Sequence, residues 1–160
     1  MRKQIFEYEP IEKIHNPRAV VIVCDATFYG KKKDKLGTLV FKDILSGEVL
    51  IWKHVQSELT KDYKQLLQRL LDIGYEVKAI IIDGKRGLYK VFKGYPVQMC
   101  HFHQKKVIQR YITMHPRLEA GKDLQKIMYN LTSTTQTIFT KKLNEWHEKY
   151  EVPLVGIKIF

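Results

Sequence analysis

Residues 19–25 read AVVIVCD, a continuous apolar run rich in valine that ends in an acid. Residues 77–83 read VKAIIID and have the same arrangement. Short apolar runs of this kind are typical of strands buried in the middle of a sheet. We therefore predict two central strands, over residues 19–24 and 77–82, each followed directly by an aspartate, Asp25 and Asp83.

Two further strands are predicted between these runs, over residues 36–44 and 48–55. Ser46-Gly47 separates them and is a hairpin signal. Gly30 and the lysine-rich residues 31–35 form a basic turn after the first strand. The first three strands should therefore form an antiparallel meander.

The remaining segments are predicted to be mostly helical. Leucines recur at spacings of three and four over residues 58–73, and Gly74 follows as a helix stop. A helix over residues 86–92, a strand over 96–99 and helices over 102–111, 118–130 and 135–150 complete the chain. This order of elements is that of the RNase H-like fold. We predict an α/β fold with a mixed five-stranded sheet, in which the antiparallel meander is joined by parallel strands.

Helices are expected to flank this sheet on both faces, because the two central runs are apolar on both sides. The length of 160 residues fits one domain. We expect a polar lead-in over residues 1–18, a catalytic core over 19–115 and the beginning of a helical insertion over 116–160.

The charge of the chain favours polyanionic partners. Its 28 lysines and arginines exceed its 17 acids, for a net charge of +11. Two cysteines do not suggest a disulfide framework, and no apolar signal region or membrane-length run is present. We expect a soluble cytoplasmic protein. Motifs of P-loop enzymes, of nucleophile-elbow hydrolases and of paired-cysteine zinc fingers are absent from the sequence.

Asp25 and Asp83 are the candidate catalytic residues. Adjacent parallel strands would bring both carboxylates to one end of the sheet, where ligand sites lie. Two neighbouring carboxylates repel each other unless a cation or shifted pKa values relieve the repulsion. Mg²⁺ or Mn²⁺ prefers such oxygen ligands, and a pair of ions can promote phosphodiester displacement. We predict that Asp25 binds two ions and Asp83 one; the alternative is that each aspartate only caps a turn.

Several basic residues are candidates for contacts with DNA. Lys85 and Arg86 follow Asp83 and Gly84 and are predicted to contact phosphate near the carboxylates. The predicted salt-sensitive DNA-binding residues are Lys31, Lys32, Lys33, Lys105, Lys106 and Arg110. In the alternative interpretation these charges are solvated and bind nothing.

Cys100 and His103 follow the fifth predicted strand. Cysteine and histidine are zinc ligands, but no second pair at suitable spacing completes a four-ligand site. We predict instead that both residues line the active site and orient DNA or a carboxylate. A plain core position for Cys100 is the alternative.

Three segments in this order resemble the Mutator-like (MULE) DDE transposases of the bacterial insertion-sequence branch. They are DATFY at 25–29, DGKRGL at 83–88 and QMCHFH at 98–103, and the resemblance spans about residues 19–130. In that family the first two aspartates of the DDE triad lie in the first two segments, and a C-x-x-H signature in the third matches Cys100 and His103. The resemblance implies Mg²⁺-dependent DNA strand cleavage and strand transfer at transposon ends, by an oligomer on DNA.

The third acid of that family is a glutamate that follows a helical insertion after the C-x-x-H signature. We expect it beyond Phe160, which makes this chain a truncated catalytic core whose activity alone stays open; Glu119 is the alternative within the sequence. Two other functions stay open. One is an RNase H-like nuclease that cuts without strand transfer, and the other is a non-catalytic nucleic-acid-binding remnant of a transposase.

Overall fold

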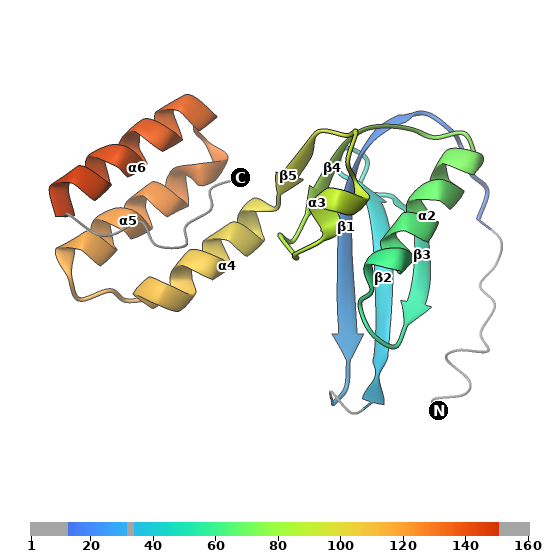
Figure 1. The fold of residues 1–160 in the computed structure, drawn as a ribbon, viewed down its shortest axis with the longest axis horizontal. Helices are drawn as coiled ribbons and strands as arrows, with labels where there is room; N and C mark the ends of the chain where they lie inside the picture. Colours follow the sequence, from blue (N-terminus) through green and yellow to red (C-terminus); the bar gives the residue numbers. More distant parts are fainter. Residues whose placement is uncertain (1–12, 32–33, 151–160) are drawn as a thin grey trace. The chain divides into compact units, whose positions relative to one another are not determined.

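The computed structural model describes residues 13–31 and 34–150. The chain divides into two compact units, residues 1–98 and residues 99–160, called here the first unit and the second unit. The first unit contains the sheet and the second contains helices (Figure 1). The predicted lead-in over residues 1–18 falls mostly outside the described residues, and the predicted domain boundaries stay predictions.

A five-stranded mixed sheet forms the first unit. Its strands are β1 (Ala19–Tyr29), β2 (Leu36–Asp43), β3 (Val49–Val55), β4 (Glu76–Ile82) and β5 (Val97–Met99), in the spatial order β3-β2-β1-β4-β5. β2 pairs antiparallel with both β1 and β3, whereas β1 and β4 pair parallel. This arrangement confirms the predicted α/β fold, including the meander, and is consistent with an RNase H-like fold.

The turn between β2 and β3 is held by a nearly buried carboxylate. Gly47 adopts a positive φ of 73°, which the predicted Ser-Gly hairpin requires. The Asp43 carboxylate, in a residue only 3% exposed, accepts hydrogen bonds from the Ser46 hydroxyl at 2.7 Å and from Arg18 at 3.0 Å. These donors, Ser46 before Arg18, lower the pKa of Asp43.

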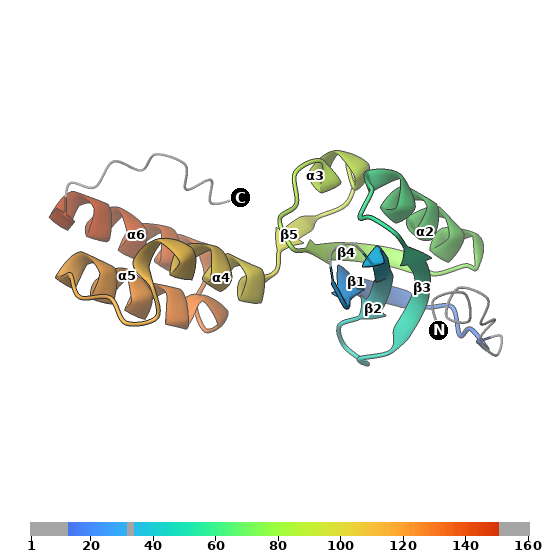
Figure 2. The same cartoon turned by 90° about the horizontal axis from the view of Figure 1, so that it is seen from below.

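Two helices cover one face of the sheet. α2 (Thr60–Asp72) and α3 (Leu88–Val91) lie on the same side in both views (Figures 1 and 2). The chain moves in one direction across the sheet from β3 to β4 to β5. Right-handed crossovers in one direction bring their helices to one face. The apolar stripe of α2 is buried there and contains Tyr63, Leu66, Leu67 and Leu70.

Within the first unit, both crossover helices lie on the same face, whereas the sequence led us to expect them on the two faces of the sheet. In β1, Val20, Ile22 and Cys24 are buried, whereas Val21 and Val23 between them keep part of their surface exposed. Such alternation is the pattern of a strand whose two faces lie in different surroundings. The apolar character of the half-exposed face is therefore not evidence of a second helical layer in the first unit.

The length of β1 also differs from the prediction. The strand was predicted to end at Cys24, but it continues to Tyr29 because β2 supplies partners as far as the pair of Tyr29 with Leu36. Asp25 consequently lies inside the strand, opposite Val40 of β2. The polar and aromatic residues after Asp25 did not extend the apolar run, and so the sequence pattern missed them.

The second unit contains α4 (His101–Ile112), α5 (Glu119–Tyr129), the 3-10 turn η2 (Asn130–Thr132) and α6 (Gln136–Tyr150), as the helical periodicity predicted. Its small buried cluster consists of Leu124, Leu131, Phe139, Leu143 and Trp146. The Trp146 indole N–H donates to the Ala120 carbonyl at 2.8 Å, joining α6 to α5. Within the described ranges, no helix combines the length and apolar character needed to cross a bilayer.

Candidate active site

The strand register brings Asp25 and Asp83 to the same level of the sheet. Val23 of β1 is paired with Ile81 of β4, and each aspartate lies two residues further along its chain. Neighbouring strands are about 4.8 Å apart, and residues two apart on a strand project from the same face. The Asp25 side chain therefore belongs to the face of β1 that carries Val23, opposite the buried core beneath α2, and Asp83 directly follows the end of β4 at Ile82.

Each aspartate also makes a local hydrogen bond. The Oδ1 atom of Asp25 accepts the Ala26 N–H at 2.9 Å, and the Oδ1 atom of Asp83 accepts the Lys85 N–H at 2.9 Å. The second bond spans Gly84, which has a φ of 89°, so Asp83 does cap the turn that follows β4. A carboxylate has about four lone-pair sites, so one such bond is compatible with a cation ligand.

Two carboxylates are the kind of oxygen ligands that a divalent ion keeping several of its waters takes. Hard ions such as Mg²⁺ are commonly bound through one or two carboxylates, with water and substrate oxygens completing their coordination. Asp25 and Asp83 are the residues that would hold it here. Among residues 13–31 and 34–150, no group of three or more histidine, cysteine, aspartate or glutamate side chains could hold a metal.

A partly buried polar cluster supports the turn after Asp83. The Lys85 ammonium lies 3.0 Å from the Glu58 carboxylate and donates to the Glu58 carbonyl at 2.6 Å. The hydroxyl of Tyr63, a residue only 1% exposed, donates to the Glu58 carboxylate at 2.5 Å. Lys85 thereby ties the turn to the segment that precedes α2. Its predicted contact with phosphate stays a prediction, and Arg86 beside it is exposed.

Glu58 was not singled out from the sequence. An acid shortly before a helix is common, and its partners Tyr63 and Lys85 lie 5 and 27 positions away along the chain. Only the approach of the start of α2 to the end of β4 makes this glutamate part of the site. No local motif could have shown it.

Negative charge at this end of the sheet contributes to raised pKa values of two buried side chains. Burial raises the pKa of the Tyr63 hydroxyl, as do its bond to Glu58 and the charges of Glu58 and Asp83. Burial also raises the pKa of the Cys24 thiol, with a further contribution from the charge of Asp25. The charges of Asp83 and Asp25 thus contribute to the raised pKa values of Tyr63 and Cys24. Negative charge gathered in this way is stabilised by a bound cation.

A row of polar side chains continues across the sheet next to Asp25. Thr27 is paired with Thr38 of β2, and Thr38 is paired with His54 of β3. The Thr38 Oγ1 and His54 Nδ1 atoms are 3.1 Å apart, and the Trp52 ring packs edge-on against His54. The alternation of β1 puts Thr27 on the face of Asp25. This row was not predicted, since its members belong to three different strands.

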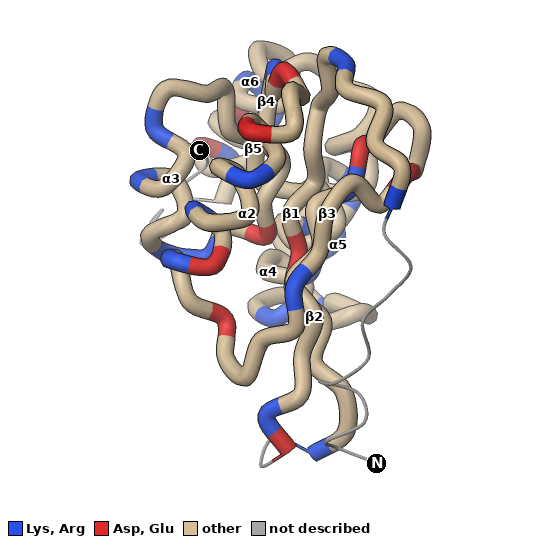
Figure 3. Tube along the Cα trace, turned by 90° about the vertical axis from the view of Figure 1, so that its right-hand side faces the viewer, with Lys and Arg blue, Asp and Glu red and all other residues tan. Residues whose placement is uncertain are grey.

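Lysines and arginines occur in both units (Figure 3), and the predicted DNA-binding residues likewise belong to both. Lys31 is exposed at the end of the β1–β2 hairpin, and Lys32 and Lys33 lie outside the described residues. In α4, Lys105 donates to the Tyr129 carbonyl at 3.4 Å, and the Lys106 ammonium lies 5.3 Å from the centre of the Phe102 ring. Arg110 is exposed in the same helix. Their role in DNA binding stays a prediction.

Cys100 and His103 both belong to the second unit. Cys100 directly precedes α4 and carries a partly exposed free thiol. His103 lies in the first turn, and its Nδ1 atom is buried without a hydrogen-bond partner in the described part of the chain. Their predicted place in the active site also stays a prediction.

Glu119, the alternative third acid, begins α5. Its side chain is 68% exposed and forms an ion pair with Lys122 at 2.6 Å, which lowers the pKa of Glu119.

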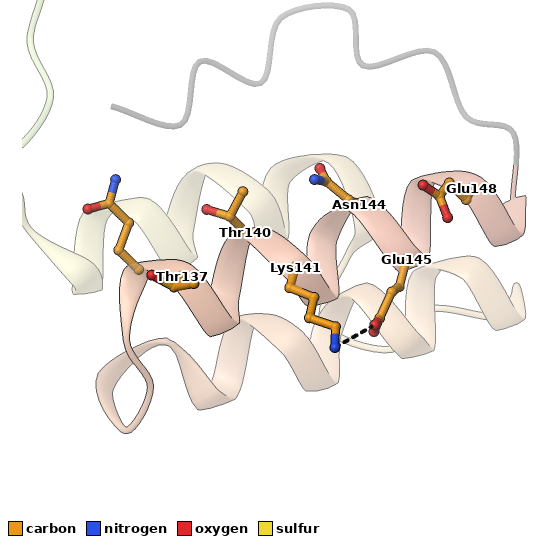
Figure 4. Close-up of a pocket in the computed structure, with 7 residues that line it drawn as sticks. Thr137, Thr140, Lys141, Asn144, Glu145 and Glu148 are labelled. Atoms are coloured by element: carbon orange, nitrogen blue, oxygen red, sulfur yellow. Dashed lines mark ion pairs between the residues drawn. The ribbon is translucent and has the colours of Figure 1, made fainter.

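α6 presents an open, shallow polar surface in the same unit (Figure 4). Lys141 and Glu145 form an ion pair there, with their charged atoms 3.9 Å apart. That surface contains none of the predicted site residues.

No protein-family model matches this chain, and no curated protein matches it. Among solved structures it is similar to a chain of the simian T-cell lymphotropic virus intasome in complex with the PP2A regulatory subunit B56 gamma. That similarity has a TM-score of 0.39 and 14% sequence identity, and it covers 92% of this chain and 55% of the other. The chain therefore spans about half the length of the structure it matches. A likeness of this size supports no conclusion on activity, which has to be argued from the site itself.

Proposed function

We propose that this chain is the catalytic core of a DDE-type DNA transposase of the Mutator-like group, which cleaves transposon ends and joins them to target DNA. The observation that carries the proposal is the parallel register of β1 and β4, whose last pair, Val23 with Ile81, stands two residues before each aspartate. These are the aspartates that the resemblance to the Mutator-like family makes catalytic. The net charge of +11 adds an attraction for the DNA backbone.

Each residue at this end of the sheet has a role in the proposed reaction. Asp25 and Asp83 hold divalent metal ions, which when bound promote attack by a water or a 3′-hydroxyl and stabilise the leaving oxygen. The Lys85–Glu58 ion pair and the Asp83 turn hold the second carboxylate in place. Arg86, exposed beside that turn, contacts a DNA phosphate. The partners are transposon-end DNA, target DNA and further copies of the chain on the paired ends.

Metal binding and DNA nicking test this proposal together. The full chain is titrated with Mn²⁺, observed by electron paramagnetic resonance, and is then incubated with supercoiled plasmid DNA and Mn²⁺. Asp25→Asn and Asp83→Asn should each weaken Mn²⁺ binding by at least about 10-fold. Both should reduce nicking to background. Asp72→Asn, an exposed acid of the same unit, is the matched control and should change neither quantity.

The outcomes separate the proposed function from its alternatives. Equal nicking by the wild type and Asp83→Asn would remove Asp83 from the chemistry. Nicking that depends on both aspartates, without joining of a supplied DNA end to the plasmid, would favour an RNase H-like nuclease. DNA binding without any carboxylate-dependent Mn²⁺ binding would favour a non-catalytic remnant.

A further inference from the structure

The second half of β1 extends beyond the residues that β4 accompanies. The pairs between β1 and β4 end at Val23, whereas the pairs between β1 and β2 continue to Tyr29. Figure 1 shows β1 and β2 running on together past the end of β4. The part of the β1–β2 hairpin that β4 does not accompany contains Asp25 and the residues of β1 that follow it. Side chains on this part are therefore close in sequence to the candidate active site.

Two large aromatic rings lie on this part of β1. Phe28 is 46% exposed and Tyr29 is 52% exposed, unlike the buried rings of Phe41 and Phe92 in the core. A Cβ atom added to Gly37 would lie 2.6 Å from the Phe28 ring, so that ring rests directly against the glycine backbone. Because Gly37 has no side chain, the Phe28 ring packs directly against the backbone of β2.

Tyr29 shares a strand face with the candidate catalytic carboxylate. Asp25, Thr27 and Tyr29 are separated by two residues each, so their side chains project from the same face of β1. At about 3.3 Å per residue, the Tyr29 backbone is about 13 Å from that of Asp25. Since stacked nucleotides rise by about 3.4 Å, this corresponds to three or four nucleotides of one strand.

The charge beside these rings favours a polyanion over an apolar protein partner. Lys31 and Lys35 are exposed where the hairpin turns, and residues 30–36 contain four lysines against the single acid Asp34. The Asp34 carboxylate is engaged inside the turn, where it accepts the Lys31 N–H at 2.8 Å. Exposed rings beside lysines are the combination by which proteins bind single-stranded nucleic acid, with bases on the rings and phosphates on the cations.

We propose that Tyr29 is a stacking site for an unpaired DNA base a few nucleotides from the phosphate that the aspartates act on. The inference rests on the proposed function and deepens it, since it requires the DNA strand to separate from its complement next to the cleavage position. Stacking on a ring is tolerant of base identity, so this site orients the strand and does not read its sequence.

The test measures binding to a fluorescein-labelled oligothymidine of about 20 nucleotides by fluorescence anisotropy, in EDTA. Tyr29→Ala should weaken binding by about 5-fold or more, and Phe28→Ala should weaken it less. Tyr29→Phe, which keeps the ring, should bind as the wild type does. Leu45→Ala removes an 84% exposed apolar side chain from the β2–β3 turn of the same unit and is the matched control, expected to have no effect.

Salt dependence distinguishes stacking from a loss of charge or of structure. Tyr29→Ala should leave the slope of log affinity against log salt concentration unchanged, whereas Lys31→Ala should reduce that slope by about one unit. The fluorescence of Trp52 in β3 reports whether each variant keeps the fold of the first unit.

Binding by Tyr29→Ala equal to that of the wild type would overturn the inference, as would equal losses in Tyr29→Ala and Tyr29→Phe. No binding of oligothymidine by the wild type would also overturn it, without touching the plasmid-nicking result. Because the binding assay contains no metal, Tyr29-dependent binding without aspartate-dependent nicking would support the stacking site and count against the transposase proposal.

Discussion

The two units differ in how completely they bury their apolar and acidic side chains. In the first unit the core contains fully buried aliphatic and aromatic side chains from four strands and two helices, among them Ile22, Phe41, Leu70 and Phe92. The second unit buries a smaller cluster, and none of the twelve residues of α4 is buried within the described chain. A catalytic carboxylate needs a rigid support, and both candidate aspartates belong to the better-packed unit, Asp25 within β1 and Asp83 directly after β4.

The acids of the two units show the same contrast. Asp43 and Asp62 in the first unit are 3% and 5% exposed, and each is paired with a cation. Asp123 in the second unit is partly exposed and accepts the Tyr150 hydroxyl at 2.7 Å and Lys149 at 2.9 Å. Breaking a buried pair leaves an uncompensated polar group, whereas an exposed pair exchanges its partners for water.

The two tryptophans allow each unit to be followed separately. Trp52 lies in β3 of the first unit, and Trp146 lies in α6 of the second. Variants that keep one tryptophan and replace the other by phenylalanine report on the unfolding of one unit in urea. The predictions below use these two signals.

The largest effect is expected from Phe92→Ala. Phe92 is fully buried between the rings of Phe41 and Tyr63, so its truncation should leave a cavity and cost about 3–5 kcal/mol. The urea midpoint measured through Trp52 should fall strongly, while the transition measured through Trp146 should stay where it is.

Tyr89→Ala serves as the control for Phe92→Ala, because Tyr89 lies in α3, the short helix that Phe92 directly follows, but is 39% exposed. It should change the Trp52 transition only slightly. An equal shift of both tryptophan signals in Phe92→Ala would mean that the two units unfold as one, and the contrast between them would then be wrong.

A medium effect is expected from Asp43→Asn. This carboxylate fastens the β2–β3 turn through Ser46 and Arg18, and its loss should cost about 1–3 kcal/mol at neutral pH. Because the folded state lowers the pKa of Asp43, its contribution is complete above the ordinary value of about 3.9 and disappears as pH falls through the lower folded value.

The pH series checks this sign. The stability difference between the wild type and Asp43→Asn, measured by urea unfolding through Trp52, should be constant at neutral pH and shrink below about pH 4. Asp72→Asn, an exposed acid at the end of α2, should show a much smaller difference. A difference for Asp43→Asn that grows on acidification would contradict the assignment.

The smallest effect is expected from Asp123→Asn. Its bonds to Tyr150 and Lys149 join α5 to α6 at a solvated surface, so the urea midpoint measured through Trp146 should fall less than Asp43→Asn lowers that of the first unit. The ionic part should largely vanish in about 1 M salt. Glu145→Gln, which removes the exposed pair with Lys141, is the control. A loss larger than that of Asp43→Asn would reverse the comparison.

Local patterns in the sequence predicted most of the elements. The leucine spacing located α2, the Ser46-Gly47 pair located the β2–β3 turn, and the apolar runs located β1 and β4. The same apolar runs led to two errors within the first unit, the end of β1 at Cys24 and crossover helices on both faces. Both arise because hydrophobicity along a strand does not report how far a neighbouring strand pairs with it or which face a helix covers.

The sequence by itself determined the elements, the meander and the positive charge, because these depend on the spacing of nearby residues and on composition. It also placed an aspartate at the end of each apolar run. Only the tertiary structure decided that β4 pairs with β1 in the register that aligns Asp25 with Asp83. The same is true of the Glu58–Lys85 support and of the exposed rings on the extended half of β1. Strand register and crossover direction join residues far apart in the chain, and no local spacing specifies them.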